Sequence, residues 1–146
     1  MKSFFPARSS KTPLILLILF PIGAAGYYAL ELAFRGFSHW TMALCGGLCV
    51  CLIFLANRKL ADRPLLLRAL TGAAIITAVE FVTGCIVNLW LGWGIWNYSH
   101  LPLNLLGQIT PVFSVIWFLL CIPVCMGCSL ANLALLRTKL REKKAE

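Results

Sequence analysis

Four long apolar runs constrain the fold of this chain more than any other feature of its sequence. They cover approximately residues 13–34, 40–56, 66–91 and 103–136. A helix needs ~20 apolar residues to cross a bilayer, whereas barrel strands would appear as ~10-residue segments of alternating hydrophobicity. With 60% hydrophobic residues, the chain is also more apolar than ordinary soluble domains, in which the share is ~45–50%. The sequence therefore predicts an all-α membrane protein, a single domain of residues 1–146 with four transmembrane helices.

The net charge of +8 comes from basic residues gathered at the ends of the apolar runs. This distribution favours anionic lipid headgroups over nucleic acid as their partners. Because cytoplasmic segments carry the excess of Lys and Arg, we expect a multi-pass protein of the cell membrane with both termini in the cytoplasm. The clusters are Lys2, Arg8 and Lys11; Arg58, Lys59, Arg63 and Arg68; and Arg137, Lys139, Arg141, Lys143 and Lys144.

The first apolar run has two interpretations. Its basic leader and the small residues at 23–26 also describe a signal peptide with a cleavage site. The apolar sequence nevertheless continues through Phe34 to full spanning length, so we expect an uncleaved first span, kinked near Pro21.

Seven cysteines all lie within the apolar runs. Cys121, Cys125 and Cys128 share a helical face, as do Cys45 and Cys49, which suggests metal ligands. The two groups, however, fall at different depths along their spans, and a zinc site needs four ligands at one level. We therefore expect small core residues, no metal site and no cofactor.

One carboxylate interrupts the third run. Counted from Arg68, Glu80 lies ~18 Å along the helix axis, close to the middle of a bilayer. A charge there costs ~2.5–3.5 kcal/mol on the insertion scale, so a residue of this kind is a candidate functional group. Thr83 and Asn88 follow on the same helical face and could donate hydrogen bonds.

The segment after the third run is aromatic, then apolar again. Trp90, Trp93 and Trp96 are typical of a membrane interface, and glycines at 92 and 94 should end the helix. We place Asn104 and Gln108 on one face of the fourth span, together with Pro111 and Ser114. An unpaired carboxylate in hydrocarbon is untenable. We therefore predict that residues 104–111 bend inward and bring Gln108 within hydrogen-bond reach of the Glu80 helix.

Two local features of the first half are also interpretable. Glu31 and Arg35 have the spacing of a helical ion pair, at the outer end of the first span. The pair either anchors the helix end or forms the mouth of a site. Gly46 and Gly47 indicate close helix packing in the second span.

The two outer turns resemble each other. Residues 38–46 and 99–107 match at Ser, His, Leu and Gly, which aligns His39 with His100. The match predicts a duplicated two-helix hairpin related by an axis along the membrane normal. Each histidine is either a proton-handling or metal-binding group or a polar cap at a helix start.

Two motif blocks closely resemble a bacterial family labelled putative ABC-transporter permease, type IV, over roughly residues 23–120. The blocks consist of Glu31, Arg35, Gly36, Ser38, His39, Trp40, Met42, Gly46 and Gly47, and of Glu80, Thr83, Gly84, Trp96, Tyr98, Ser99, Pro102, Asn104, Gly107 and Gln108. The resemblance implies transport. One position departs from the family pattern, because the residue before Tyr98 is commonly aspartate and here is Asn97. The chain has no Walker phosphate loop, so ATP hydrolysis would require a separate ATPase subunit.

Two classes of function remain open. In the first, the protein is a transporter or permease-like component, working as a homo-oligomer or beside a partner membrane subunit. Its solute or ion site would consist of Glu80, Asn88, Asn104 and Gln108, with Glu31, His39 and His100 at the outer opening. In the second, it is a non-transporting accessory or assembly partner of another membrane protein. We expect no enzyme, because a lone buried acid without a nucleophile–base pair lacks a catalytic constellation.

Overall fold

The fold is all-α, as predicted. A computed structural model describes the backbone of residues 12–145 and the side chains of residues 12–134 and 137. The leader bases Lys2, Arg8 and Lys11 lie outside the described residues, as do the side chains of Lys139, Arg141, Lys143 and Lys144. The elements are α1 (Thr12–Arg35), α2 (Trp40–Lys59), α3 (Leu65–Gly84), the π-helical turn η1 (Cys85–Trp90) and α4 (Pro111–Ala145).

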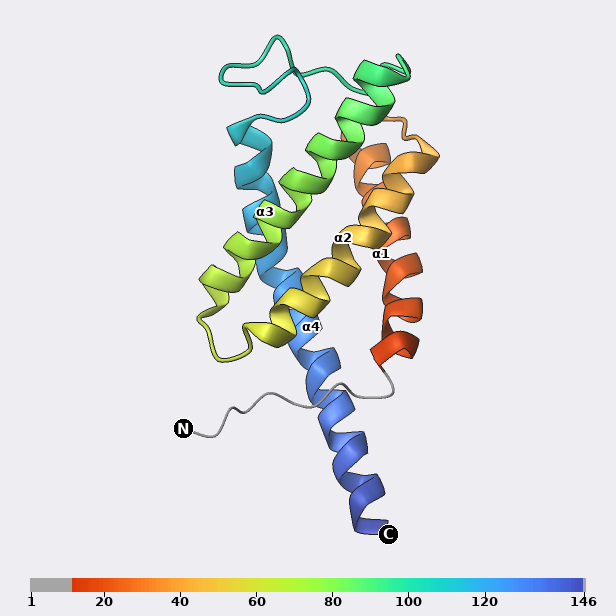
Figure 1. Ribbon diagram of the computed structural model, residues 1–146, viewed down its shortest axis with the longest axis vertical. Helices are drawn as coiled ribbons and strands as arrows, with labels where there is room; N and C mark the ends of the chain where they lie inside the picture. Colours follow the sequence, from red (N-terminus) through yellow and green to blue (C-terminus); the bar gives the residue numbers. More distant parts are fainter. Residues whose placement is uncertain (1–11, 146) are drawn as a thin grey trace.

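The expectation of four spans is confirmed. Four stretches are long and apolar enough to cross a membrane: Thr12–Arg35, Trp40–Lys59, Leu65–Trp90 and Pro111–Ala134. The turn between α1 and α2 and the long loop before α4 lie at one end of the bundle, and the turn between α2 and α3 lies at the other (Figure 1). We call these the outer and inner ends, following the orientation expected from the basic clusters.

The predicted start of the fourth span is wrong. Helix α4 begins at Pro111 rather than near residue 103, so Asn104 and Gln108 precede it and do not share a helical face with Ser114. Residues 91–110 form an irregular loop whose backbone has positive φ at Gly92, Gly94, Leu103, Leu106 and Gly107. Proline is well suited to the first position of a helix, because its missing N–H would have no partner there.

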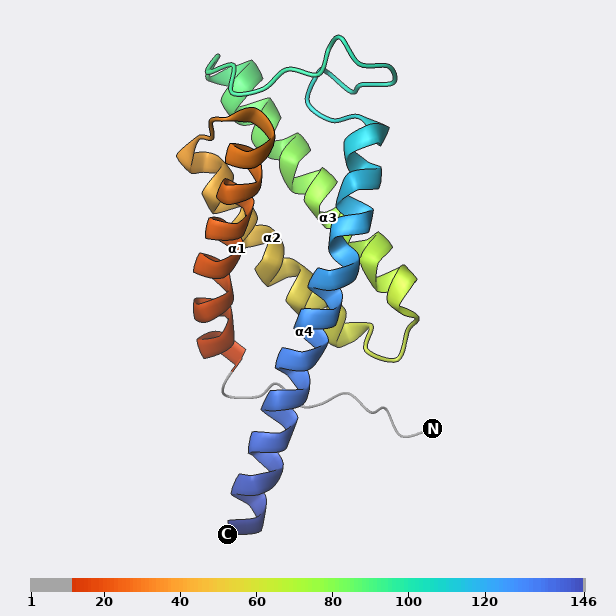
Figure 2. The same ribbon diagram turned by 180° about the vertical axis from the view of Figure 1, so that it is seen from behind.

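The helices pack as two antiparallel pairs. Helix α1 lies along α2, and α3 crosses α4 (Figures 1 and 2). Within the described residues, the backbone of α1 does not closely approach α3 or α4. The largest core cluster joins α2, α3 and α4 and includes four of the cysteines: Cys49, Ile53, Phe54, Ala69, Ile76, Cys121, Cys125 and Cys128.

Glycines bring α1 and α2 together, as the sequence indicated. A Cβ atom at Gly46 would lie 2.6 Å from the carbonyl oxygen of Gly23, and one at Gly47 would lie 2.8 Å from Phe20. Neither position can hold a larger residue without moving α1. The glycines therefore let the two helices approach closely enough for side chains of α1 to enter the bundle.

The two outer histidines are not in equivalent positions. His39 immediately precedes α2 and caps it, with its Nδ1 accepting from the Thr41 N–H at 3.4 Å. His100 lies in an exposed turn, and the segment that follows it is not helical. The expected equivalence is therefore wrong at this point, because the second unit has no helix where the first has α2.

Candidate intramembrane site

The Glu80 carboxylate lies inside the bundle and is only 5% exposed. The Tyr27 hydroxyl donates to its Oε1 atom at 2.5 Å, and the Trp117 indole N–H donates to its Oε2 atom at 2.7 Å. Both carboxylate oxygens therefore accept hydrogen bonds from neutral aromatic donors. Among the described residues, no cationic side chain forms an ion pair with Glu80.

Three helices meet at this carboxylate. Glu80 belongs to α3, Tyr27 to α1 and Trp117 to α4, and the Tyr27 and Trp117 rings are 5.6 Å apart. The backbone of α1 remains apart from α3 and α4, so the long Tyr27 side chain connects α1 to Glu80. Helix α2 contributes Gly46, whose missing side chain leaves room for Tyr27.

A layer of aromatic and apolar side chains covers Glu80 on the outer side. Tyr27, Met42, Val87 and Trp96 form one buried cluster, with Tyr98 and Trp117 packed against it. Tyr98, which lies in the loop outside the spans, stacks on Phe113 with ring centroids 4.5 Å apart. Burial raises the pKa of Tyr98 to about 12, so its hydroxyl stays protonated at neutral pH.

The loop before α4 is fastened to η1 by two amides. The Asn88 side chain donates to Gln108 Oε1 at 2.8 Å and accepts from the Ile95 N–H at 2.7 Å. The Trp96 indole donates to the Gln108 carbonyl at 3.0 Å. Gly84 has no Cβ atom, which would lie 2.5 Å from Gln108 Oε1. The prediction that Gln108 reaches the helix of Glu80 is thus confirmed.

The prediction of which side chains donate hydrogen bonds to Glu80 was wrong. Thr83 bonds to the Cys45 sulfur, and Asn88 and Gln108 bond to each other. Asn104 also turns into its own loop, where its Nδ2 donates to the Ser99 and Leu101 carbonyls and its Oδ1 accepts from the Gly107 N–H. The actual donors come from other helices, and no spacing along the sequence pairs them with Glu80.

The Glu31–Arg35 ion pair is confirmed. Arg35 Nη2 lies 2.8 Å from Glu31 Oε1, and the Ser38 hydroxyl donates to Oε2 at 2.6 Å. Arg35 Nη1 also donates to the Ile95 carbonyl at 3.3 Å. The pair therefore connects the turn between α1 and α2 to the loop that follows η1.

The histidines lie at the surface of the outer end. The His39 ring is 5.5 Å from the Trp40 ring and 5.4 Å from the Trp93 ring. No group of three or more His, Cys, Asp and Glu side chains that could hold a metal ion occurs in the described part of the chain. His39 thus caps α2 and contacts two tryptophan rings.

A second polar cluster, at the inner end, was missed in the sequence. Arg68 Nη1 donates to Asn57 Oδ1 at 3.1 Å and to the Ser129 hydroxyl at 2.8 Å. Asn57 is 4% exposed and also donates to the Cys125 carbonyl. Arg68 had been interpreted only as one cytoplasmic base among several, since nothing in a charge count indicates which base turns inward.

The fold and the site together define a helical membrane protein with a buried carboxylate shared by three spans. The chain belongs to the family described as "Putative ABC-transporter type IV", whose model matches residues 24–141. No curated protein and no solved structure matches it.

Proposed function

We propose that this protein is a membrane-embedded component of a transport system, with Glu80 as its central polar group. The observation that supports this function is the position of the Glu80 carboxylate: it is buried within a spanning helix, yet its partners are only neutral donors. Ionisable residues inside spans characteristically mark solute, ion or proton pathways. The family to which the chain belongs is described as a transporter type.

In this proposal the outer side of Glu80 is closed in the described conformation. The route from outside to Glu80 passes the loop that Asn88 and Gln108 hold against η1. When the loop moves away, both amides lose their partner and become available to a solute, with Asn104 in the same loop. Glu31, His39 and His100 line the outer opening in this proposal. A solute that binds Glu80 replaces the Tyr27 and Trp117 donors and is therefore cationic or rich in N–H or O–H groups.

The energy source lies outside the chain. The sequence contains no phosphate-binding loop of the Walker type. In this proposal a separate ATPase or a second membrane subunit drives the cycle, or the protein works as a homo-oligomer that follows a solute gradient.

Reconstitution into lipid vesicles tests the proposal. We expect the wild-type protein to carry at least one of protons, rubidium ions and labelled amino acids, and Glu80→Gln to abolish that flux. Glutamine keeps the size of the side chain and its carbonyl acceptor but removes the titratable group. Glu31→Gln is the matched control and should retain most of the flux. Negligible effects of both substitutions on a measurable flux would refute the role of Glu80.

A second function has support from one observation. Both Glu80 oxygens and the amides of Asn88, Asn104 and Gln108 already have partners within the chain. A site whose polar groups are all hydrogen-bonded within the chain suits an accessory protein that packs against another membrane protein and transports nothing itself. Purification in mild detergent discriminates between the two classes. A stoichiometric membrane partner, together with absent flux in vesicles of the isolated protein, favours the accessory function.

The proposed orientation has its own test. With both termini in the cytoplasm, Ser38 and Ser99 lie outside and Asp62 inside. We expect an impermeant maleimide to label Ser38→Cys and Ser99→Cys in intact cells, and Asp62→Cys only after lysis. The native cysteines are all within the spans, so they contribute little background. Protection of both serine positions would reverse the orientation.

A further inference from the structure

In the loop between η1 and α4, two amide side chains turn inward and three leucine side chains face outward, while Asn97, Ser99 and His100 of the same loop are exposed. Asn104 and Gln108 turn inward and bond to the loop itself and to η1. Leucines face outward instead: Leu103 is 84% exposed, Leu106 61% and Leu105 50%. A loop surrounded by water has the opposite arrangement, because exposed apolar surface is unfavourable there.

The backbone is held in an unfavourable conformation where two of these leucines project. Leu103 has φ 55° and Leu106 has φ 52°, a left-handed region that bulky residues rarely adopt. Such a residue is strained and persists only when its surroundings impose it. Asparagine or glycine would be the usual choice in water. Leucine at both positions therefore indicates that the apolar side chains themselves have a role.

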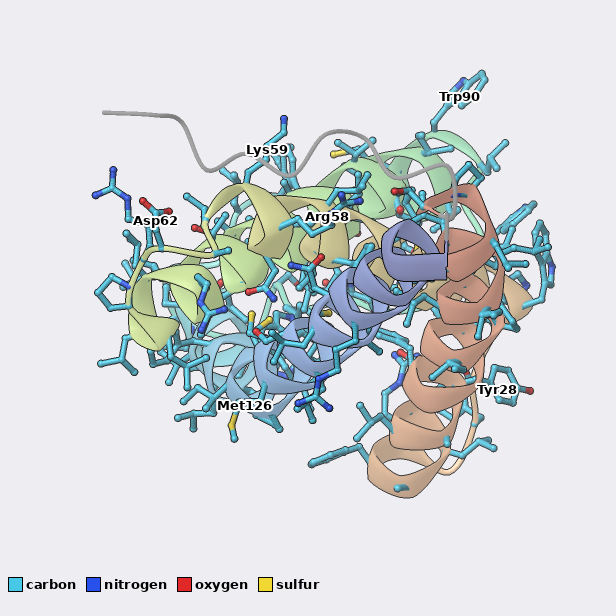
Figure 3. All side chains as sticks on the ribbon, turned by 90° about the horizontal axis from the view of Figure 1, so that it is seen from below. Tyr28, Arg58, Lys59, Asp62, Trp90 and Met126 are labelled. Carbon is cyan, nitrogen blue, oxygen red and sulfur yellow. The ribbon has the colours of Figure 1, made fainter. Side chains whose placement is uncertain are left out.

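The end of η1, which carries Trp90, lies at the same end of the bundle as the loop (Figure 1). Trp90 is 80% exposed and Trp93 48% exposed, and Trp90 points away from the bundle (Figure 3). The whole sequence from Phe81 to Leu136 contains no Asp, Glu, Lys or Arg. Tryptophan is enriched where a membrane meets water, and an uncharged loop beside it can enter the same layer.

The loop also satisfies many of its own backbone groups. The Tyr98 N–H donates to the Gly107 carbonyl at 2.8 Å, and the Leu105 N–H donates to the Ile109 carbonyl at 2.9 Å. The Gly107 N–H is bonded by the Asn104 side chain at 2.9 Å. These bonds reduce the cost of leaving water. Irregular backbone does not occur in the hydrocarbon region facing lipid, so the depth that fits is the boundary between headgroups and acyl chains.

We propose that residues 103–106 are seated in the adjoining leaflet, with Leu103, Leu105 and Leu106 inserted among the lipids at that boundary. The occupant of this surface is lipid rather than a protein, because the surface is uncharged and lies at the same end of the bundle as the exposed Trp90 and Trp93. This inference is independent of transport. It means that lipid contacts the loop between η1 and α4.

Fluorescence quenching in nanodiscs tests the proposal. An environment-sensitive fluorescent amino acid replaces Leu103 or Leu106, and Asp62, whose side chain is 79% exposed in the inner turn, provides the aqueous control. We expect blue-shifted emission at both leucine positions, strong quenching by lipids brominated on the acyl chain and weak quenching by iodide. Asp62 should give the reverse pattern. Iodide quenching at Leu103 and Leu106 equal to that at Asp62 would overturn the proposal. So would shielding from both quenchers, which would mean a protein partner or a second copy.

A substitution gives an independent readout. Leu103→Asn and Leu106→Asn place a residue that tolerates positive φ at each strained position. If the loop faced water, both variants would be as stable as the parent or more stable. Because we place the leucines among lipids, we expect both variants to have a lower Tm in nanodiscs. An unchanged or higher Tm for both would overturn the proposal.

Discussion

The bundle contains two inward-turned charges, Glu80 and Arg68, and holds them differently. Glu80 has both oxygens bonded, by aromatic donors from α1 and α4. Within the part of the chain that the structure describes, Arg68 is bonded through Nη1 to small polar groups of α2 and α4, and its Nε is buried without a partner. Neither charge has an opposite charge beside it among the described residues.

The difference lies in which helices each cluster needs. The Arg68 cluster uses α2, α3 and α4, which share the main core. The Glu80 cluster also needs α1, which packs closely only against α2 and reaches Glu80 through Tyr27. A displacement of α1 would therefore break the Glu80 cluster and leave the Arg68 cluster intact. The Glu80 cluster thus includes one donor from α1, whereas the Arg68 cluster includes none.

The largest expected effect comes from Gly46→Val, which displaces α1. Its Cβ would lie 2.6 Å from the Gly23 carbonyl oxygen and would also conflict with Tyr27. We expect a loss of about 3 kcal/mol in unfolding free energy, measured by reversible SDS titration in mixed micelles. Gly26→Val is the control, because nothing lies within 4 Å of a Cβ at that position. Equal losses in the two variants would contradict the close packing of α1 on α2.

Trp117→Phe should have the next largest effect, because it removes one of the two donors of Glu80. Leaving a buried acceptor without a partner costs about 1–3 kcal/mol. In a Glu80→Leu background the same substitution should lower the free energy of unfolding much less, since that variant has no carboxylate to accept from the indole N–H. This double-mutant cycle measures the coupling directly, and a coupling near zero would show that the hydrogen bond contributes nothing to stability.

Ser129→Ala probes the inner cluster and should cost about 0.5–1.5 kcal/mol. The loss is smaller than at Trp117 because Arg68 keeps Asn57 as a partner and lies near the inner end of α3. Thr71→Ala is the control, as that hydroxyl bonds only the Leu67 carbonyl one turn earlier. If Ser129→Ala destabilised the protein more than Trp117→Phe, the Arg68 cluster would contribute more to stability than the Glu80 cluster.

The smallest effect is expected for Glu31→Gln. The ion pair with Arg35 lies at the outer end of α1, and pairs near water contribute about 0–1 kcal/mol. Glutamine still accepts hydrogen bonds from Ser38 and Arg35. A loss comparable to that of Trp117→Phe would show that the turn between α1 and α2 is as tightly coupled to the bundle as Glu80 is.

The sequence predicted those features that depend on neighbours along one helix. The spans follow from apolar length, the Glu31–Arg35 pair from its four-residue spacing, and the role of Gly46 from the absence of a side chain. The start of α4 could not be predicted from apolarity, because the leucines of the loop are as apolar as a span. Pro111, a residue suited to the first position of a helix, marks the start of α4 better than apolarity does.

The partners of Glu80 could not be predicted because they depend on how helices cross. Tyr27 is 53 residues from Glu80 in the chain, and Trp117 is 37 residues away. Any tyrosine or tryptophan in an apolar run could serve equally well on sequence grounds. Gln108 was identifiable because a buried Glu80 needs hydrogen-bond donors and Gln108 carries an amide near the start of the predicted fourth span, although its partner proved to be Asn88.

The order of the partners along the chain has a consequence for biogenesis. Synthesis proceeds from the amino end, so α1 and α2 are in the membrane before Glu80 leaves the ribosome. The hydroxyl of Tyr27 is then already present when α3 enters, whereas Trp117 arrives only with α4. The Glu80 carboxylate would thus have a hydrogen-bond donor as soon as α3 packs against the first helical pair.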